Sequence, residues 1–272
     1  MEYLDLNTNH KLPAIGFGTW RITPDEAAQQ AVATALAIGY RLIDTAHIYG
    51  NERGVGAAIR ESGIPRADLF VTSKLWNDDQ GYDRALKAFD QSLQKLGLEY
   101  LDLYLIHWPA TTKRHESWRA LERLYSEGRI KAAGVSNYTR QHLEELRQRS
   151  PLTPAVNQVE FHAFIYQQQQ TVLTYCKQQG IVVEAYSPLN RLSREEHGLV
   201  LEIAQKYDKT PQQIVLRWCV QHGTVPLLRS TNPEHIANNF MVFDFELSDS
   251  DIEALDTLSD GERVTWDPAG MG

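Results

Sequence analysis

The sequence predicts an α/β fold in which eight parallel strands, each followed by a helix, close into a (β/α)8 TIM barrel. Short apolar segments alternate with longer amphipathic ones, the order expected of strands joined by right-handed helical crossovers. Several apolar segments carry almost no polar residues, as strands buried on both faces do. No linker or low-complexity tract interrupts the 272 residues, so we expect one domain spanning 1–272.

Eight segments carry the strand pattern, and eight is the number that closes this kind of barrel. They are 14–19, 41–45, 69–75, 101–107, 130–136, 155–160, 181–187 and 224–230. The segment 82–96 is typical of the helices between them, because its larger apolar residues recur at intervals of three and four. These residues are Leu86, Phe89, Leu93 and Leu96.

Residues with special backbone preferences mark the helix ends. Pro24 with Asp25 opens the first helix, and Pro211 after Thr210 opens a later one. Glycines are expected to close five helices, where a left-handed residue precedes the next strand. They are Gly39, Gly97, Gly128, Gly180 and Gly223.

Three segments lie outside the eight repeats. The alternating stretch from Tyr3 to Pro13, around Asn7-Thr8-Asn9, predicts a hairpin that caps the bottom of the barrel. Residues 193–207 and 248–258 predict two extra helices. A doubly wound open sheet is the weaker alternative, because no GxGxxG motif follows the first strand and eight repeats are many for that fold.

Composition excludes several classes of protein. Lys and Arg number 27 against 35 Asp and Glu, and the net charge of −8 argues against a general nucleic-acid binder, although a local basic pocket for a phosphorylated cofactor remains open. Cys176 and Cys219 fit neither a disulfide framework nor a metal spacing. With no signal peptide and no membrane-length apolar run, we expect a cytoplasmic protein without metal or membrane partner. No segment indicates a large apolar interface, so we favour a monomer.

Four ionisable residues of different types are expected to meet at one rim of the barrel. Asp44, Lys74 and His107 end the second, third and fourth strands, and Tyr49 follows in the loop after Asp44. Catalytic groups gather at the C-terminal ends of the strands in such barrels. Each residue alone is more often structural, but their coincidence at adjacent strand ends favours a shared function.

The chemistry of the four residues is complementary. A lysine cation next to a tyrosine is expected to lower the phenol pKa by about 1–3 units, and an aspartate would hold the lysine charged. A histidine could place a carbonyl oxygen next to the phenol, which would then protonate it. The set suits carbonyl reduction by hydride transfer.

Long stretches of the chain are similar to the aldo-keto reductase family. They are GYRLIDTAHIYGNERGVGAAIRESGIPRADLFVTSKLW (39–76), LDLYLIHWP (101–109), GVSNY (134–138), VNQVEFH (156–162), EAYSPL (184–189) and LLRSTNPEHIANNF (227–240). The resemblance covers essentially the whole chain. Within the family, the chain resembles the small bacterial members with short loops, of the 2,5-diketo-gluconate reductase type.

The resemblance implies an NADPH-dependent reductase in which Tyr49 is the general acid. It makes Lys74 and Asp44 the residues that tune the phenol, and His107 the residue that orients the carbonyl. It also matches residues to contacts with every part of the dinucleotide, from the nicotinamide ribose to the adenosine 2′-phosphate. They are Gly18, Thr19, Trp20 and Asp44 at the ribose, Ser136, Asn137 and Gln158 at the carboxamide, Tyr186 at the ring, Ser187 and Leu189 at the pyrophosphate, and Arg229, Ser230, Thr231, His235, Asn238 and Asn239 at the adenosine end.

Two residues depart from the family pattern at the phosphate end. Arg229 stands where the family commonly has Lys, and His235 stands where it commonly has Arg. Arg229 keeps a fixed cation, whereas His235 is mostly neutral at pH 7. We therefore expect NADPH to be preferred over NADH by a smaller margin than is typical.

Tryptophans at the strand ends are expected to line the substrate pocket with His107. Trp20, Trp76 and Trp108 follow strand ends, and Trp266 lies in a short C-terminal tail. The short loops suit small carbonyl substrates: aliphatic and aromatic aldehydes, α-dicarbonyls, keto sugars or keto acids.

Two other functions remain open at this stage. One is a nicotinamide-binding regulatory subunit of the same fold with little turnover, although the chain has no long N-terminal extension to bind a partner. The other is a barrel enzyme without nicotinamide, such as an isomerase that uses Lys74.

Overall fold

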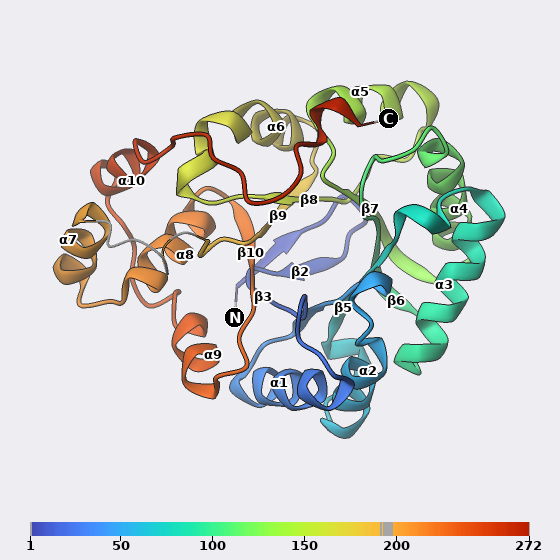
Figure 1. Ribbon diagram of the computed structural model, residues 1–272, viewed down its shortest axis with the longest axis horizontal. Coiled ribbons are helices and arrows are strands. Elements are labelled where there is room, and N and C mark those ends of the chain that lie inside the picture. The colour runs from blue at the N-terminus through green and yellow to red at the C-terminus, as the bar shows by residue number, and fades with distance from the viewer. Residues whose placement is uncertain (1, 191, 193–197, 272) are drawn as a thin grey trace.

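The computed structural model describes residues 2–190, 192 and 198–271, and its centre is a closed barrel of parallel strands (Figure 1). Every strand falls within a segment that the sequence predicts, so the expected (β/α)8 barrel is confirmed. Around the barrel the order is β10-β3-β4-β5-β6-β7-β8-β9. The bounds are β3 Gly16–Gly18, β4 Leu42–Asp44, β5 Phe70–Leu75, β6 Leu101–Ile106, β7 Ile130–Ser136, β8 Val156–Glu160, β9 Val182–Tyr186 and β10 Thr224–Leu228.

Helices surround the barrel as an outer ring (Figure 1). The ring consists of α1 Asp25–Ile38, α2 Glu52–Glu61, α3 Tyr82–Leu96, α4 Arg114–Ser126, α5 Arg140–Arg149, α6 Tyr166–Gln178, α8 Pro211–Gln221 and α9 Pro233–Phe240. The five glycines expected at helix ends all have positive φ. Thr210 caps α8 by accepting a hydrogen bond from the backbone N–H of Gln213, whose side chain returns the contact. Pro24 precedes α1 as expected.

Two helices lie outside the strand–helix count, as expected. The first, α7 Gly198–Tyr207, matches the described part of the predicted 193–207, and residues 193–197 lie outside the described residues. The second, α10 Asp249–Asp256, matches the predicted 248–258 within two residues. None of the described helices is both long enough and apolar enough to cross a lipid bilayer.

A hairpin closes the bottom of the barrel, as the N-terminal pattern predicts. Strands β1 Tyr3–Asp5 and β2 Lys11–Pro13 are antiparallel, and Asn9 lies in the turn with a φ of 62°. Leu6 and Leu12 are buried in the same cluster as the side chains of the barrel interior. The hairpin therefore shields the lower end of that interior from water.

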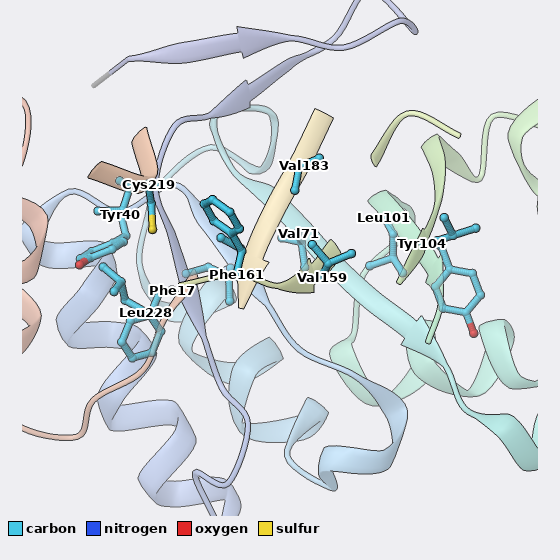
Figure 2. Packing of buried hydrophobic residues seen from close by; sticks show 14 of the residues in the cluster. Phe17, Tyr40, Val71, Leu101, Tyr104, Val159, Phe161, Val183, Cys219 and Leu228 are labelled. Atoms are coloured by element: carbon cyan, nitrogen blue, oxygen red, sulfur yellow. The ribbon is translucent and has the colours of Figure 1, made fainter. Parts of the chain in front are cut away.

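Successive residues of each strand face opposite sides of the barrel wall. Leu42, Phe70 and Val156 belong to the interior cluster. Their neighbours Ile43 and Val71 belong to the larger cluster between the strands and the helices. Figure 2 shows part of this outer cluster, including Phe17, Val71, Val159, Val183 and Leu228. The alternation decides which polar residues point into the barrel.

The free thiols of the chain are structural. Cys176 on α6 and Cys219 on α8 are buried and unpaired with each other. Burial raises the pKa of both thiols, to about 12 for Cys176. The thiols are therefore protonated and unreactive at physiological pH.

Helices α2 and α3 pack closely at a glycine. A Cβ on Gly56 would fall well inside contact distance of the backbone carbonyl of Leu96. Alanine favours helix by about 1 kcal/mol over glycine, but overpacking against backbone costs about 1–3 kcal/mol or more. We therefore expect Gly56→Ala to lower the free energy of unfolding by about 2 kcal/mol, measured by urea denaturation.

The matched control for this substitution is Gly198→Ala. Gly198 begins α7, its φ is not in the left-handed region, and no atom of the described residues lies within 4 Å of the place that an added Cβ would take. The control is expected to be neutral or stabilising by less than about 1 kcal/mol. Equal effects of the two substitutions would contradict the close approach of α2 to α3.

Candidate active site

A layer of polar side chains lies inside the barrel, above its apolar interior. Asp44 on β4 follows the inward-facing Leu42 by two residues, and Gln158 on β8 follows Val156 in the same way. Lys74 on β5 and Glu184 on β9 are also buried, and Glu184 is the register partner of Gln158. The alternation of the strands therefore brings four polar groups from distant parts of the sequence into one layer.

An ion pair forms the centre of this layer. The Lys74 ammonium donates to both carboxylate oxygens of Asp44, at 2.6 and 2.7 Å, and to the backbone carbonyl of Thr45 at 3.0 Å. Burial alone would lower the Lys74 pKa, but Asp44 and Tyr49 more than offset it, and the pKa is raised. Lys74 is therefore a charged ammonium at physiological pH.

The loop that carries Tyr49 is fixed by two buried residues. Tyr49 ends the 3-10 turn η1 His47–Tyr49. The Asn51 amide donates to the carbonyls of Thr19 and Ile22 at 2.8 and 3.0 Å, and so ties this loop to the one after β3. The Glu52 carboxylate accepts from the hydroxyl of Ser73 on β5 at 2.8 Å. These contacts hold the phenol at one place on the rim.

The Tyr49 hydroxyl lies 3.3 Å from the Lys74 ammonium. The sequence predicted that this cation would lower the phenol pKa, and Lys74 does act in that direction, but the net shift is upward. Burial raises the Tyr49 pKa by more than Lys74 lowers it, and the charge of Asp44 raises it further. Tyr49 therefore carries its proton at physiological pH, next to a cation that favours its loss.

His107 lies beside Tyr49 at the same rim. The ring centroids are 5.8 Å apart and the rings meet edge to face, while Trp76 flanks the imidazole on another side at 5.2 Å. Burial, with the Lys74 charge in addition, holds the His107 pKa well below its usual range. The imidazole is therefore neutral and has one N–H to donate. Its Nδ1 has no hydrogen-bond partner among the described residues.

The three residues expected at a carboxamide lie together, Ser136 and Asn137 at the end of β7 and Gln158 beside them on β8. Ser136 donates to the backbone carbonyl of Gln158 at 2.8 Å. Asn137 adopts a left-handed backbone conformation, with a φ of 63°, and its amide donates to the carbonyl of His107 at 2.9 Å. Tyr186 donates to the Asn137 side-chain oxygen at 2.8 Å. Asn137 thus links His107, which is expected to orient the substrate carbonyl, to Tyr186, which is expected to lie against the nicotinamide ring.

The C-terminal tail is held on this rim by a carboxylate that the sequence analysis did not single out. Glu160, at the end of β8, accepts the backbone N–H groups of Val264 and Thr265 at 2.8 and 3.2 Å and the Thr265 hydroxyl at 2.6 Å. The same hydroxyl lies 2.8 Å from the Tyr186 phenol. Figure 1 shows the tail (red) passing from α10 over the α6 side toward α5.

The predicted tryptophan wall is only partly assembled. Trp266 packs on Trp108 with ring centroids 5.4 Å apart, although Trp266 is 60% exposed. Trp76 lies against His107. Trp20 is exposed and stacks with the guanidinium of Arg21 at 4.2 Å, and among the described residues no ring contact joins it to the other three tryptophans.

The residues expected at the ribose and pyrophosphate flank the polar layer. Gly18 is the register partner of Asp44, and the backbone N–H of Thr19 donates to the Asp44 carbonyl at 3.0 Å. Ser187 follows β9 in a left-handed conformation, with a φ of 54°, and its carbonyl accepts from the N–H of Asn190 at 3.0 Å. Leu189 is half-buried in the turn that results.

The residues expected at the adenosine end gather around the start of α9. Arg229, Thr231, His235 and Asn238 are exposed, Ser230 is half-buried and Asn239 is buried. The N-cap Asn232 accepts the N–H groups of Glu234 and His235. An exposed guanidinium and a helix N-terminus are suited to a phosphate, so these residues fit the expected 2′-phosphate. The backbone carbonyl of Asn238 accepts from the Gln213 side chain at 3.1 Å.

Glu184, in the polar layer, is a second carboxylate that was not predicted as a site residue. Its register with Gln158 and its position two residues before Tyr186 place it on the inward face of β9. The signal was present in the sequence, since Glu184 is the one charged residue in the predicted strand 181–187.

The buried ion pair generates a test of coupling. Asp44→Asn leaves an ammonium without a counter-charge, and Lys74→Met leaves a carboxylate without one, so each is expected to cost about 3–5 kcal/mol of unfolding free energy. The loss of unfolding free energy in the double variant is expected to be smaller than the sum of the two single losses by at least about 2 kcal/mol. All three losses are measured by urea denaturation. The surface pair Arg123–Glu127 serves as control and should show little coupling. Additive losses at Asp44 and Lys74 would contradict the direct pairing.

The sequence matches a known protein family and several characterised proteins. The family model described as the aldo/keto reductase family matches residues 14–260. A glyoxal reductase of Bacillus subtilis is 46% identical over 267 residues, which cover 98% of this chain and 96% of that protein. A 9,11-endoperoxide prostaglandin H2 reductase of Trypanosoma cruzi is 47% identical over 268 residues, covering 97% and 93%.

Solved structures agree over the whole fold. An aldo-keto reductase from a deep-sea metagenome library of the Medee basin has a TM-score of 0.95 at 43% identity, covering 99% of both chains. The aldo-keto reductase of Bombyx mori, solved in complex with NADP, has a TM-score of 0.92 at 34% identity and covers 97% of this chain and 94% of that one. With a family model matching most of its length and relatives of this identity, the chain belongs to the aldo/keto reductase family.

Proposed function

We propose that this protein reduces small aldehydes and ketones to alcohols with NADPH, with Tyr49 as the general acid. The observation that carries the proposal is the Tyr49 hydroxyl, 3.3 Å from an ammonium that Asp44 holds and beside the ring of His107. General acid catalysis needs a proton held within reach of the developing negative charge and a group that stabilises the base left behind.

Each residue has one task in this reaction. When bound, the nicotinamide supplies the hydride that adds to the carbonyl carbon. Tyr49 gives its proton to the carbonyl oxygen, and Lys74 stabilises the phenolate that remains. His107 is neutral and packs against Trp76. It donates a hydrogen bond that orients the carbonyl oxygen toward the phenol.

The chain offers a matching set of groups for NADPH. Gln158 uses its amide N–H groups on Asp44 and Glu184, at 2.9 and 2.7 Å, which leaves its carbonyl oxygen as an acceptor for a carboxamide. Tyr186 provides a flat face for the ring. Arg229, close to the start of α9, provides a cation for the 2′-phosphate, and His235 adds a weaker partner there.

The substrates that fit best are small and open-chain or aromatic carbonyls. Trp76, Trp108 and Trp266 provide apolar contact area near His107, and the loop before α4 is short. α-Dicarbonyls, keto sugars and aromatic aldehydes match this description, and the glyoxal reductase among the relatives supports the first of these. That the protein acts as a cytoplasmic monomer stays a prediction.

The role of Tyr49 is tested with Tyr49→Phe. Removal of the proton donor is expected to lower kcat about 10²–10⁴-fold on an α-dicarbonyl, since the phenol acts mainly in the transition state. The measurement is NADPH consumption with a panel of carbonyls, together with cofactor binding by quenching of tryptophan fluorescence. Binding is expected to change little.

Tyr3→Phe is the matched control, because Tyr3 is exposed in the hairpin at the opposite end of the barrel. It should leave turnover unchanged. A Tyr49→Phe variant with nearly full rate would refute the assignment. Wild-type protein that binds NADPH without reducing any carbonyl in the panel would favour a regulatory role, and failure to bind NADPH would favour chemistry without nicotinamide.

The choice of cofactor is tested at the phosphate end. We expect kcat/KM to be higher with NADPH than with NADH, by a modest margin because His235 lacks the permanent charge of an arginine. His235→Arg adds a permanent cation in the first turn of α9 and is expected to widen the margin by roughly tenfold, which corresponds to one charge-assisted hydrogen bond. Equal use of the two cofactors by the wild type, or a His235→Arg variant with an unchanged ratio, would contradict this assignment.

A further inference from the structure

Glu184 is a buried carboxyl group for which the proposed reaction has no use. It lies inside the barrel on β9, and one of its oxygens, Oε2, accepts from the Gln158 amide at 2.7 Å. The other oxygen, Oε1, is buried and has no hydrogen-bond partner among the described residues. A buried carboxyl group without full hydrogen bonding is costly, so its presence in the layer calls for an explanation.

The Gln158 amide is held from two sides. Its nitrogen donates to Asp44 Oδ2 at 2.9 Å and to Glu184 Oε2 at 2.7 Å. An amide nitrogen has only two hydrogens, so both are used, and the planar group cannot turn over without facing its oxygen toward two carboxyl groups. Glu184 and Asp44 together therefore fix which way the Gln158 carbonyl oxygen points.

Glu184 also holds a proton near neutral pH. Burial and the charge of Asp44 raise its pKa to about 8, against the lowering effects of Gln158 and Lys74. The charged groups that act on it are Asp44 and Lys74. Its register partners, Gln158 on β8 and Val225 on β10, carry no charge. The unpartnered Oε1 can carry the proton while Oε2 continues to accept from Gln158.

We propose that Glu184 is a positioning residue that orients the Gln158 amide for the nicotinamide carboxamide, and that loss of its proton favours the oxidised over the reduced dinucleotide. The first part follows from the two-sided hold on the amide. The second follows because an ionised Glu184 adds a negative charge to the layer, and the oxidised nicotinamide ring is positively charged whereas the reduced ring is neutral. The inference rests on the proposed use of NADP(H).

The test compares dissociation constants of NADP+ and NADPH, measured by quenching of tryptophan fluorescence about one pH unit below and above the Glu184 pKa of about 8. The ratio of the two constants cancels the titration of the 2′-phosphate that both ligands carry. In the wild type we expect the dissociation constant of NADP+, divided by that of NADPH, to be lower by roughly threefold or more at the higher pH. In Glu184→Gln, which keeps an acceptor for Gln158, the ratio should stay constant.

A second variant and a control complete the binding experiment. Glu184→Val removes the acceptor as well as the charge, so both dinucleotides are expected to bind roughly tenfold more weakly, and their ratio should not respond to pH. Glu127→Gln changes an exposed carboxylate on the outer surface and should behave like the wild type. If Glu184→Gln does not fold, Glu184→Val still reports whether the pH response depends on this side chain.

A measurement on the protein without dinucleotide tests the titration separately. The folded pKa of Glu184 lies above the value of an unfolded chain, so its ionisation cost grows as pH rises from about 4.5 to about 8. The Tm of Glu184→Gln, relative to that of the wild type, is therefore expected to rise over this range.

The outcomes separate this inference from the proposed function. Wild-type protein that binds neither dinucleotide would overturn both. Binding with a pH-independent ratio in the wild type, or with the same pH response in Glu184→Gln, would overturn the role of Glu184 alone. Full-affinity binding by Glu184→Val would overturn the positioning of Gln158.

Discussion

The buried contact between Lys74 and Asp44 is the constraint on which the rest of the site depends. An ammonium with no exposure to water is tolerated only because two carboxylate oxygens and a carbonyl surround it. Such a pair is weak evidence for stability, because desolvation offsets much of the attraction and apolar residues would serve the barrel as well. Its retention at a strand end, within reach of a phenol, indicates chemistry.

The alternation of the strands made much of this site predictable. Residues that follow an apolar inward-facing residue by two or four positions must face inward too, so Asp44 and Lys74 could be placed on one layer from the sequence. His107 follows β6 in the same way. The hairpin and the helix ends were predictable for a similar reason, since turn and capping preferences are local.

Contacts between distant segments were not predictable in this way. The hold of Glu160 on Val264 and Thr265 joins residues about a hundred positions apart, and no periodicity reports it. Glu184 was visible as a charge within an apolar strand, but its partner Gln158 depends on the register of β8 and β9. The net direction of the Tyr49 pKa could not be predicted in this way. The sequence indicates that Lys74 is a neighbour of the phenol, but it does not show how strongly burial raises the pKa.

A phenol with a raised pKa is compatible with the proposed role of Tyr49 and defines it more closely. An acid must hold its proton until negative charge develops on the substrate oxygen, and burial ensures that Tyr49 does so. The Lys74 cation stabilises the phenolate far more than the phenol, so its effect is largest as the proton leaves. In the proposed reaction the layer would thus separate two tasks: the protein interior would keep the proton on Tyr49 before reaction, and the ion pair would lower the free energy of the transition state in which it departs. A buried tyrosine without the lysine would lack the second of these properties.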